Sequence, residues 1–504
     1  MRPPFRRPSV RLAAVFAGAG ALCAVLAGCG GAAGPAPRTA DEAPAGLRLE
    51  LLGVAELGKT TPVDAAPVGG LSALAWQPSS GRWLALSDDR GDFGPPRLYA
   101  LAVDLADGRL EDGDVEVVGA TPLAEADGAP LAARSADPEG LALSPHGTLW
   151  ISSEGDADRD APPWLRELGT DGVTRRVILP PAHFLPAGPP DDRRGVRFNY
   201  GFEALAIAPD GRRLITAGEV ALAQDGPVVG FGQSSRARLL VVDAASGRPL
   251  AEHVYEVDPL PAPADEGGLE VGGLVELLAL GDGRLLALER TFATGRGNSV
   301  RLYAVDLAGA DRVTGAPRLP RRARPVEKRL FLDFARLDVP LDNVEGMALG
   351  PALPDGRRTL VLVSDDNFSA GQRTLFYAFA LSGAAVPPVP AAPPPARATI
   401  PEVQGVAHLS PLAGREVAGV EGVVTAVAAP VESGGRITLP GGFWMEDPAG
   451  DGDPATADGL WVSESGGPGR YPVAAGDRVR ASGRVAEVGR RGEECRRRQL
   501  AGPA

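Results

Sequence analysis

The chain has 504 residues, of which 64 are acidic and 51 basic, giving a formal net charge of -13. Its 66 Gly and 49 Pro residues, with only 5% aromatic residues, favour short strands joined by turns in an all-β protein that is long enough for more than one domain. The acidic excess argues against a general nucleic-acid-binding surface and is compatible with cation binding.

Residues 1–28 have the layout of a bacterial lipoprotein signal peptide. A basic start is followed by the apolar stretch Leu12–Leu26 and then by Ala27-Gly28-Cys29. A membrane-spanning helix needs roughly 20 apolar residues, so we interpret this shorter stretch as cleaved and Cys29 as the lipidation site. An ordinary secretory signal is the alternative. We expect a location in the cell envelope outside the cytoplasmic membrane, at the outer membrane or cell surface, with membrane contact through the lipid anchor only.

Residues 29–46, rich in Gly, Ala and Pro, are expected to form a flexible tether. Residues 47–383 then contain five related segments about 65 to 70 residues apart. They begin at Gly70, Asp137, Gly201, Gly272 and Asn343. Most units supply four short strands, which is typical of a β-propeller blade. The last unit lacks a fourth strand, and Leu47–Leu57 can supply it. Five blades are expected, or six if a degenerate blade lies near residues 156–200 or 300–340.

Residues 384–400 are dominated by Pro and Ala and predict a semi-rigid linker. Residues 401–488 contain strand-like runs with Gly-rich turns, such as Gly442-Phe443-Trp444-Met445-Glu446-Asp447. These predict a small barrel, which resembles the OB-fold-like module beside bacterial extracellular nucleases. The basic tail, residues 489–504, is expected to be disordered and ends where such a barrel normally has another strand, so we expect a truncated or altered barrel.

Acidic side chains recur at the ends of the blade strands. The first strand of a blade lines the central channel, and the loop before it lies on the same face as the loop after the second strand. We therefore expect a calcium site at one mouth of the channel, because clustered carboxylates repel one another unless a hard cation compensates them. The expected metal ligands are Asp88, Glu139, Glu154, Glu203, Glu219, Glu345 and Asp365. Asp89, Glu289 and Asp366 also end second strands and are expected at this mouth. The alternative is that these acids only hydrogen-bond backbone amides and hold the blades in register.

Two arginines follow second strands on the same predicted face. Arg90 and Arg290 are placed where a guanidinium group can bind a phosphate or carboxylate through two hydrogen bonds, or only pair with its acidic neighbours. No Gly-x-Ser-x-Gly elbow supports a Ser-His-Asp hydrolase. The histidines share no zinc-site spacing, and His146 is expected on the opposite face.

Several spaced motifs agree in order with a known family. They include Gly69-Gly70-Leu71-Ser72, Asp137-Pro138-Glu139-Gly140-Leu141 and Asp342-Asn343-Val344-Glu345-Gly346. The region resembles the phytase-like domain with esterase-like activity, found in bacterial secreted proteins and lipoproteins. The resemblance implies a calcium-dependent hydrolase of phosphate or other esters, with Glu203, Glu345, Arg90 and Arg290 in catalysis and a small or polymeric ester as substrate. Few lysines are present for a polyanion such as phytate. The competing hypothesis is a non-catalytic surface protein whose propeller is braced by calcium.

The signal peptide interpretation predicts incorporation of labelled palmitate into the wild-type protein. The Cys29→Ala variant should incorporate none, because it lacks the thiol that accepts the lipid. Equal labelling of the two proteins would contradict acylation at Cys29.

Overall fold

The computed structural model describes residues 46–58, 66–159, 161–188 and 193–389 in the first part of the chain. Beyond these it describes residues 396–501 apart from gaps at 405–409, 411, 413–415, 430, 434–435, 440, 451, 453–457, 464–472 and 489–496. Cys29 and the predicted signal peptide therefore lie outside the described residues. In the part of the chain that is described, no helix is long and apolar enough to cross a membrane.

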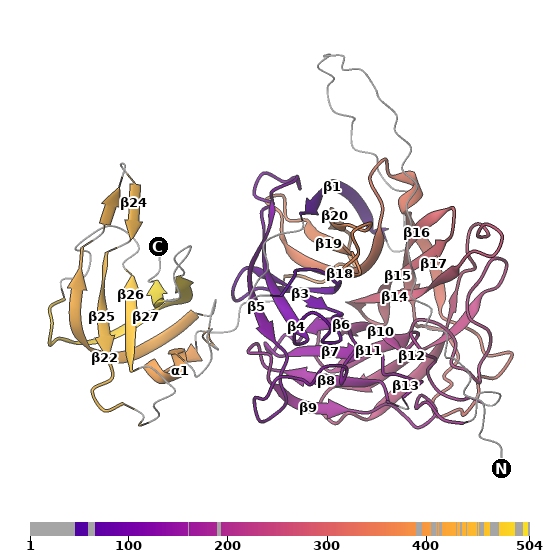
Figure 1. Ribbon diagram of the computed structural model, residues 1–504, viewed down its shortest axis with the longest axis horizontal. Coiled ribbons are helices and arrows are strands. Elements are labelled where there is room, and N and C mark those ends of the chain that lie inside the picture. Colours follow the sequence, from indigo (N-terminus) through magenta and orange to yellow (C-terminus); the bar gives the residue numbers. More distant parts are fainter. Residues whose placement is uncertain are drawn as a thin grey trace, which may run out of the picture.

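Residues 48–382 form five antiparallel sheets of four strands each, arranged around a common centre (Figure 1). Blade 1 is β2 (Leu71–Gln77), β3 (Arg82–Ser87), β4 (Arg97–Val103) and β5 (Val115–Pro122). Blade 2 is β6 (Pro138–Leu143), β7 (Leu149–Ser153), β8 (Trp164–Leu168) and β9 (Thr174–Ile178). Blade 3 is β10 (Phe202–Ile207), β11 (Arg213–Gly218), β12 (Ser235–Asp243) and β13 (Pro249–Val257). Blade 4 is β14 (Glu270–Gly281), β15 (Arg284–Ala293), β16 (Gly297–Asp306) and β17 (Glu327–Asp333).

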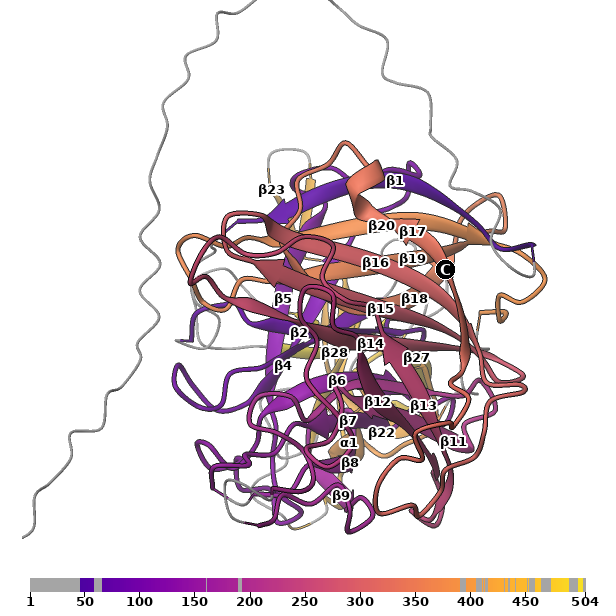
Figure 2. The ribbon, with the colours of Figure 1, turned by 90° about the vertical axis from the view of Figure 1, so that its right-hand side faces the viewer.

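Blade 5 is built from both ends of the propeller. It contains β18 (Asn343–Ala352), β19 (Arg358–Asp365) and β20 (Thr374–Ser382), and its outer strand is β1 (Arg48–Leu57). β1 pairs with β20 from Arg48 opposite Ser382 to Leu57 opposite Thr374, and the two strands lie side by side in Figure 2. The predicted β-propeller class is confirmed, and the described sheets number five rather than six.

The first strands of the blades form the inner wall of the propeller. Each of β2, β6, β10, β14 and β18 contacts the first strands of the two neighbouring blades. Glu276 on β14 joins three of these strands. It is 1% exposed, and its Oε1 accepts hydrogen bonds from the backbone N–H groups of Leu205 at 3.2 Å and Leu277 at 2.8 Å. Its carboxyl group also accepts one from Met347. Buried acids are stable only with such partners, so Glu276 links blade 4 to both neighbours.

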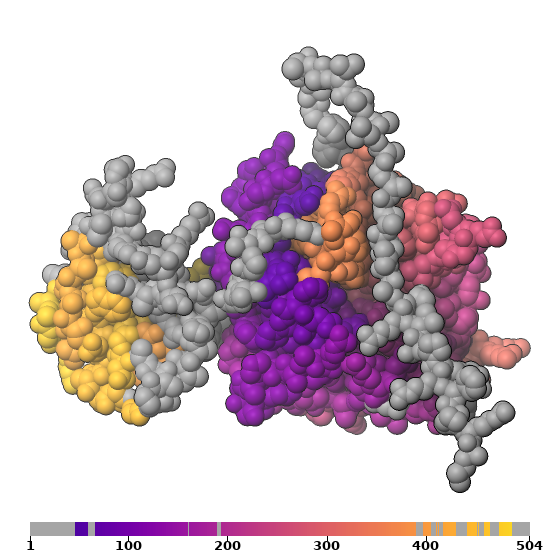
Figure 3. Space-filling view, viewed as in Figure 1, coloured from indigo at the N-terminus to yellow at the C-terminus, as the bar shows by residue number. Residues whose placement is uncertain are grey.

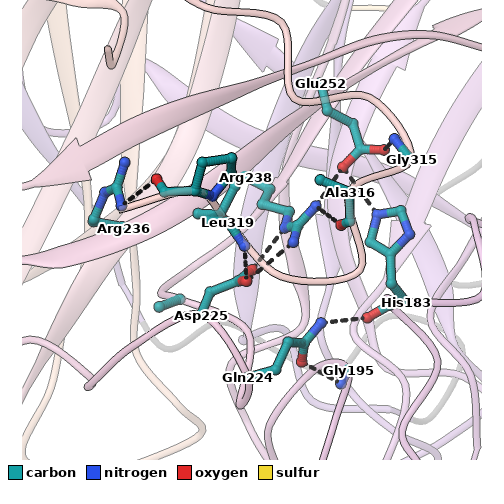
Figure 4. Close-up of polar contacts among 12 residues, drawn as sticks. His183, Gly195, Gln224, Asp225, Arg236, Arg238, Glu252, Gly315, Ala316 and Leu319 are labelled. Atoms are coloured by element: carbon teal, nitrogen blue, oxygen red, sulfur yellow. Dashed lines mark hydrogen bonds and ion pairs between the residues drawn. The ribbon is translucent and has the colours of Figure 1, made fainter. Parts of the chain in front are cut away.

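The connection between β16 and β17, residues 307–326, folds over the outer strand of blade 3 and is bonded to a buried ion-pair network of that blade (Figure 4). Arg238 on β12 pairs with Asp225 at 2.6 Å and with Glu252 at 2.9 Å, and none of the three side chains is exposed. Asp225 also accepts a hydrogen bond from the backbone of Leu319 at 2.7 Å, and Arg238 donates one to the carbonyl oxygen of Ala316 at 2.8 Å. The network therefore holds the blade 4 connection against blade 3.

A second unit follows the propeller and forms a body of its own (Figure 3). It contains the helix α1 (Ile400–Gln404) and the strands β21 (Ala396–Arg397), β22 (Glu416–Ala428), β23 (Val431–Ser433), β24 (Arg436–Leu439), β25 (Gly442–Glu446), β26 (Gly459–Ser463), β27 (Arg478–Val488) and β28 (Arg497–Ala501). Five of these strands pair in a closed ring, in the order β22, β25, β26, β28 and β27, with β27 returning to β22. β28 lies within the tail that was expected to be disordered. It supplies the strand that the truncated barrel was expected to lack.

We predict that Arg238→Met destabilises the propeller by about 3–5 kcal/mol, because it removes the guanidinium partner of the buried carboxylates of Asp225 and Glu252 and leaves Glu252 with His183 at 2.9 Å. Urea unfolding followed by fluorescence measures this loss. Arg213→Met is the control, since Arg213 pairs with Asp210 at 3.4 Å on the surface and should lose at most about 1 kcal/mol. Similar losses for both variants would contradict the structural role of the network.

Candidate functional site

The first strands of all five blades carry a β-bulge at the same place. The register shifts fall after Leu71, Pro138, Phe202, Leu274 and Val344. A bulge inserts an unpaired residue and redirects side chains at that point. In each blade, one residue directly follows the last paired residue before the shift. These five residues are Ser72, Glu139, Glu203, Val275 and Glu345, which we call the bulge set. Three of the five blades thus place a glutamate where the regular alternation of the strand is broken.

The second strands bring a further residue to the same level. The residues opposite the start of each bulge are Ser87, Ser153, Gly218, Glu289 and Ser364. The next residues along the chain are Asp88, Glu154, Glu219, Arg290 and Asp365, which we call the exit set. Four of the five are acids. The strand pairing therefore brings the predicted metal ligands of both sets to one end of the propeller.

The tightest group of acids lies at blade 2. Asp137, Glu139 and Glu154 each offer a carboxylate oxygen, and these atoms lie within 4.8 Å of one another. All three residues are at most 9% exposed. Burial, followed by repulsion from Glu203 and Asp137, raises the pKa of Glu139 well above its usual value. Burial and repulsion from Asp137 and Glu219 do the same to Glu154. The group is therefore strained electrostatically unless protons or a cation neutralise it.

Other acids of the two sets add to this repulsion. Burial is the first cause of a pKa raised well above the usual range for Asp88, Glu203 and Asp365. Asp88 is further repelled by Glu345, and Asp365 by Asp88 and Glu345. These mutual effects show that the acids of blades 1, 2, 3 and 5 share one electrostatic environment, as the sequence predicted.

Arg90 lies between the blade 2 acids and solvent. Its Nε is 2.6 Å from Asp137 Oδ1, its Nη2 is 3.9 Å from Glu154 Oε2, and its Nη2 also donates a hydrogen bond to Asn199 Oδ1 at 2.9 Å. The side chain is 36% exposed. An arginine that contacts acids on one side and solvent on the other can also contact an anionic ligand.

Arg290 lies at the blade 4 position of the exit set and is more deeply buried. Its Nη2 is 2.6 Å from Glu345 Oε1 and 3.9 Å from Glu219 Oε1. Asn343 donates a further hydrogen bond to Glu345 Oε1 at 2.9 Å. Burial raises the pKa of Glu219 to about 7, against the opposing effect of Arg290. Arg290 therefore neutralises part of the cluster from within.

A cavity of about 370 Å³ adjoins the acids at blade 2. Arg90 and Asp137 are among the residues that line it, together with Arg134, Arg159, Trp164 and Phe198. It combines three guanidinium groups with aromatic side chains and the three carboxylates of Asp137, Asp156 and Asp158, and its size lies in the range of small-molecule sites. A ligand in this cavity would lie next to Asp137 and could reach the acidic group.

Three acids expected at the mouth turn away from it. Asp89 pairs with Arg97 at 3.0 Å, Asp366 accepts a hydrogen bond from the backbone of Gly70 at 3.0 Å, and Glu289 accepts one from Tyr255 Oη at 2.8 Å. The prediction that every acid at the end of a second strand faces the channel was therefore wrong. Successive side chains of a strand point to opposite faces, so a neighbour of an exit-set residue points into the contact between blades.

The sequence reasoning also missed Asp137 as a candidate ligand. The residues at the equivalent position of the other blades, two before the bulge-set residue, are Gly70, Gly201, Gly273 and Asn343. Asp137 is therefore the acidic residue among the five. Its position two residues before Glu139 was the available signal. His146 lies in the turn between β6 and β7, at the end of these strands away from Asp137 and Glu154, as predicted.

The donor atoms fit a hard divalent cation. Among the described residues, buried Asp88 Oδ1, Asp137 Oδ1 and Glu154 Oε2 have no hydrogen-bond partner, although Asp137 Oδ1 makes the ion pair with Arg90. Calcium prefers six to eight oxygen ligands, chiefly carboxylates, carbonyls and water, and this group offers carboxylates without histidine or cysteine. Buried oxygens without partners are unusual, so a cation bound by them would explain the arrangement.

A short stretch of the chain is similar to a fungal protein. A 148-residue stretch is 28% identical to an "Uncharacterized secreted protein" of Arthroderma benhamiae, and the match covers 24% of this chain and 27% of that protein. The chain thus spans about a quarter of that relative's length.

Two solved structures have low similarity to the chain. A hypothetical protein from Leishmania major is 10% identical with a TM-score of 0.32, covering 67% of this chain and 93% of that chain. A protein titled "glucose dehydrogenase" is 17% identical with a TM-score of 0.28, covering 66% and 91%. These scores are too low to bear on function.

The sequence also matches the family described as "Phytase-like: Esterase-like activity of phytase" over residues 66–368, the region that contains both the bulge set and the exit set. Because this match takes in more than half of the 504 residues, the chain belongs to that phytase-like family.

Proposed function

We propose that the chain is an exported, lipid-anchored hydrolase of phosphate or other esters that depends on a divalent cation, with calcium as the best candidate. The observation that carries the proposal is the group Asp137, Glu139 and Glu154, whose carboxylate oxygens lie within 4.8 Å of one another. Among the described residues, Glu154 Oε2 and Asp88 Oδ1 are also buried without a hydrogen-bond partner. Membership of the phytase-like family supports hydrolysis as the type of activity.

The cation would be held by Asp137, Glu139 and Glu154, whose oxygens lie closest together. The carboxylate of Asp88 would add negative charge near this group, since it and Asp137 repel each other. Bound there, it would polarise an ester oxygen and promote ionisation of a water molecule. The protein's own part is to hold these carboxylates in place through the strand pairing of blade 2. Glu154 is fixed further because its Oε1 accepts a hydrogen bond from the backbone of Gly201 at 2.9 Å.

The substrate would bind in the cavity beside Asp137, with Arg90 contacting its anionic group. Glu203 is the candidate for proton transfer. Burial, followed by repulsion from Glu154 and Glu219, raises its pKa well above that of an ordinary glutamate. A carboxyl group with a raised pKa keeps its proton to a higher pH than an ordinary glutamate, which suits a group that transfers a proton in catalysis.

The first prediction concerns stability against pH and calcium. Because the folded-state pKa values of Glu139, Glu154 and Glu203 are raised, the folded protein without metal binds more protons than the unfolded chain. Its stability should therefore fall as pH rises above about 4, the ordinary pKa of a glutamate, and through the raised pKa values of these groups. Calcium binds the ionised forms of Glu139 and Glu154, so its stabilising effect should grow as pH rises, reaching about 2.7 kcal/mol at a hundredfold excess over Kd.

Thermal unfolding in chelator and in saturating calcium measures this effect. A Glu139→Gln/Glu154→Gln variant should show little difference between the two conditions, because it lacks two of the ligands. Equal melting temperatures of the wild type in chelator and calcium at pH 8 would contradict the metal site.

The second prediction concerns catalysis. Glu154→Gln and Glu203→Gln should each lower kcat/KM for a hydrolysed ester by at least about 10–100-fold with little change in fold, through a weaker cation site and a lost proton carrier respectively. Arg90→Ala should raise KM more for anionic than for neutral esters. His146→Ala is the control and should keep full activity, because His146 lies at the other end of its blade. Full activity in both glutamine variants would place the site elsewhere. If the wild type hydrolyses neither phosphate nor acyl esters, the calcium-braced binding protein becomes the better hypothesis.

A further inference from the structure

Blade 4 departs from the other blades at both positions that face the channel mouth. In the bulge set it carries Val275, where three blades carry glutamate and blade 1 carries Ser72. In the exit set it carries Arg290, where every other blade carries an acid. The strand pairing places these residues at equivalent sites, so their chemistry can be compared directly. Blade 4 has no acid at either position and has a fixed positive charge at one of them.

The guanidinium group of Arg290 is built into the cluster. The side chain is 13% exposed, compared with 36% for Arg90. It contacts Glu345 at 2.6 Å and Glu219 at 3.9 Å. Burial alone would lower the pKa of Arg290, but Glu345, Glu219 and Glu203 outweigh burial and raise it. Arg290 therefore stays charged and is surrounded by the acids of blades 3 and 5.

The two sides of the mouth differ in how deeply their arginine is buried. Arg290 is 13% exposed, whereas Arg90, which contacts Asp137 at 2.6 Å and Glu154 at 3.9 Å on the blade 2 side, is 36% exposed. In the described part of the chain, the acids close enough to share a metal ion are Asp137, Glu139 and Glu154, which lie on the side of the more exposed arginine.

We propose that Arg290 is a resident cation, which takes the place of a metal ion among Glu203, Glu219 and Glu345 and confines divalent-cation binding to Asp137, Glu139 and Glu154. This inference rests on the proposed metal site and adds where metal binds and what prevents binding on the other side. Glu219, which the sequence predicted as a ligand, is then a partner of Arg290. Without Arg290, three buried carboxylates would face one another without a counter-charge, which is the condition that favours a hard cation.

The blade symmetry supplies a matched pair of variants for the test. Glu154 and Glu219 occupy the same exit-set position in blades 2 and 3 and are both at most 3% exposed. Calcium binding to the full chain, stripped of metal beforehand, can be measured by isothermal titration calorimetry. The wild type should bind one ion at the mouth. Glu154→Gln should lose that ion or bind it at least about tenfold more weakly, whereas Glu219→Gln should bind it as the wild type does.

Arg290→Met tests the resident cation directly, with Arg290→Lys as the control that retains a positive charge. Arg290→Met should bind one more calcium ion than the wild type, and Arg290→Lys should bind the same number. If Arg290→Met folds only in the presence of calcium, this also supports the proposal, and its calcium content is then measured by equilibrium dialysis. If it does not fold at all, the Glu154 and Glu219 variants decide the question.

Each other outcome is informative. An unchanged stoichiometry in folded Arg290→Met overturns the resident-cation role but leaves the blade 2 site intact. Loss of an ion in Glu219→Gln with Arg290 present shows that metal binds on the Arg290 side, and this also overturns the inference. A wild type that binds no calcium at the mouth, with Glu154→Gln behaving identically, rejects the proposed metal site and leaves Arg290 with no ion to confine.

Discussion

Repulsion among carboxylates is the constraint that the mouth of this propeller has to satisfy. Asp88, Asp137, Glu139, Glu154, Glu203, Glu219, Glu345 and Asp365 converge there, and Arg90 and Arg290 are the guanidinium groups that contact them. Eight acids against two cations leave an excess of six negative charges if every acid is ionised. Holding that excess of negative charge in a partly buried site would cost much free energy, so protons, a metal ion or both must reduce it. The proposed metal site and the proposed role of Arg290 both follow from this imbalance.

The scaffold can hold such a cluster because the propeller ring is closed and cross-linked. β1 completes blade 5, so the first strand of the propeller pairs with its last strand, β20. The inner strands are tied by Glu276, and the outer strand of blade 3 is tied to blade 4 through Arg238. The β1–β20 pairing and the Arg238 network involve the outer strands of the blades, whereas Glu276 directly follows the bulge-set residue Val275 in the wall. The repulsive site is therefore placed where five strands are held in position by contacts that do not depend on it.

The sequence predicted the architecture well because repeats and turn residues are local patterns. The five segments, the missing strand of blade 5 and the convergence of Glu139, Glu203 and Glu345 could all be inferred from spacing. The direction of individual side chains could not, because the bulges that decide it depend on pairing between strands. Glu289 and Arg290 are neighbours, yet one faces Tyr255 and the other faces Glu345. The role of β28 was also hidden, since it completes the ring of the second unit by a parallel pairing with β26, a strand that is not its neighbour in the sequence.

The bulges also explain how one strand can serve structure and function at the same time. In blade 5 the glutamate follows the register shift directly, and Glu345 faces Arg290 at the mouth. In blade 4 that place belongs to Val275, and the glutamate one residue later, Glu276, accepts backbone hydrogen bonds inside the wall. The two sequence segments are similar, but one contributes a residue of the site and the other a residue that links the blades. The positions of the two glutamates in their strands differ by one residue. Because a one-residue shift reverses the face of a side chain, blade 4, which has Val275 instead of a glutamate at the mouth, gains the internal link through Glu276.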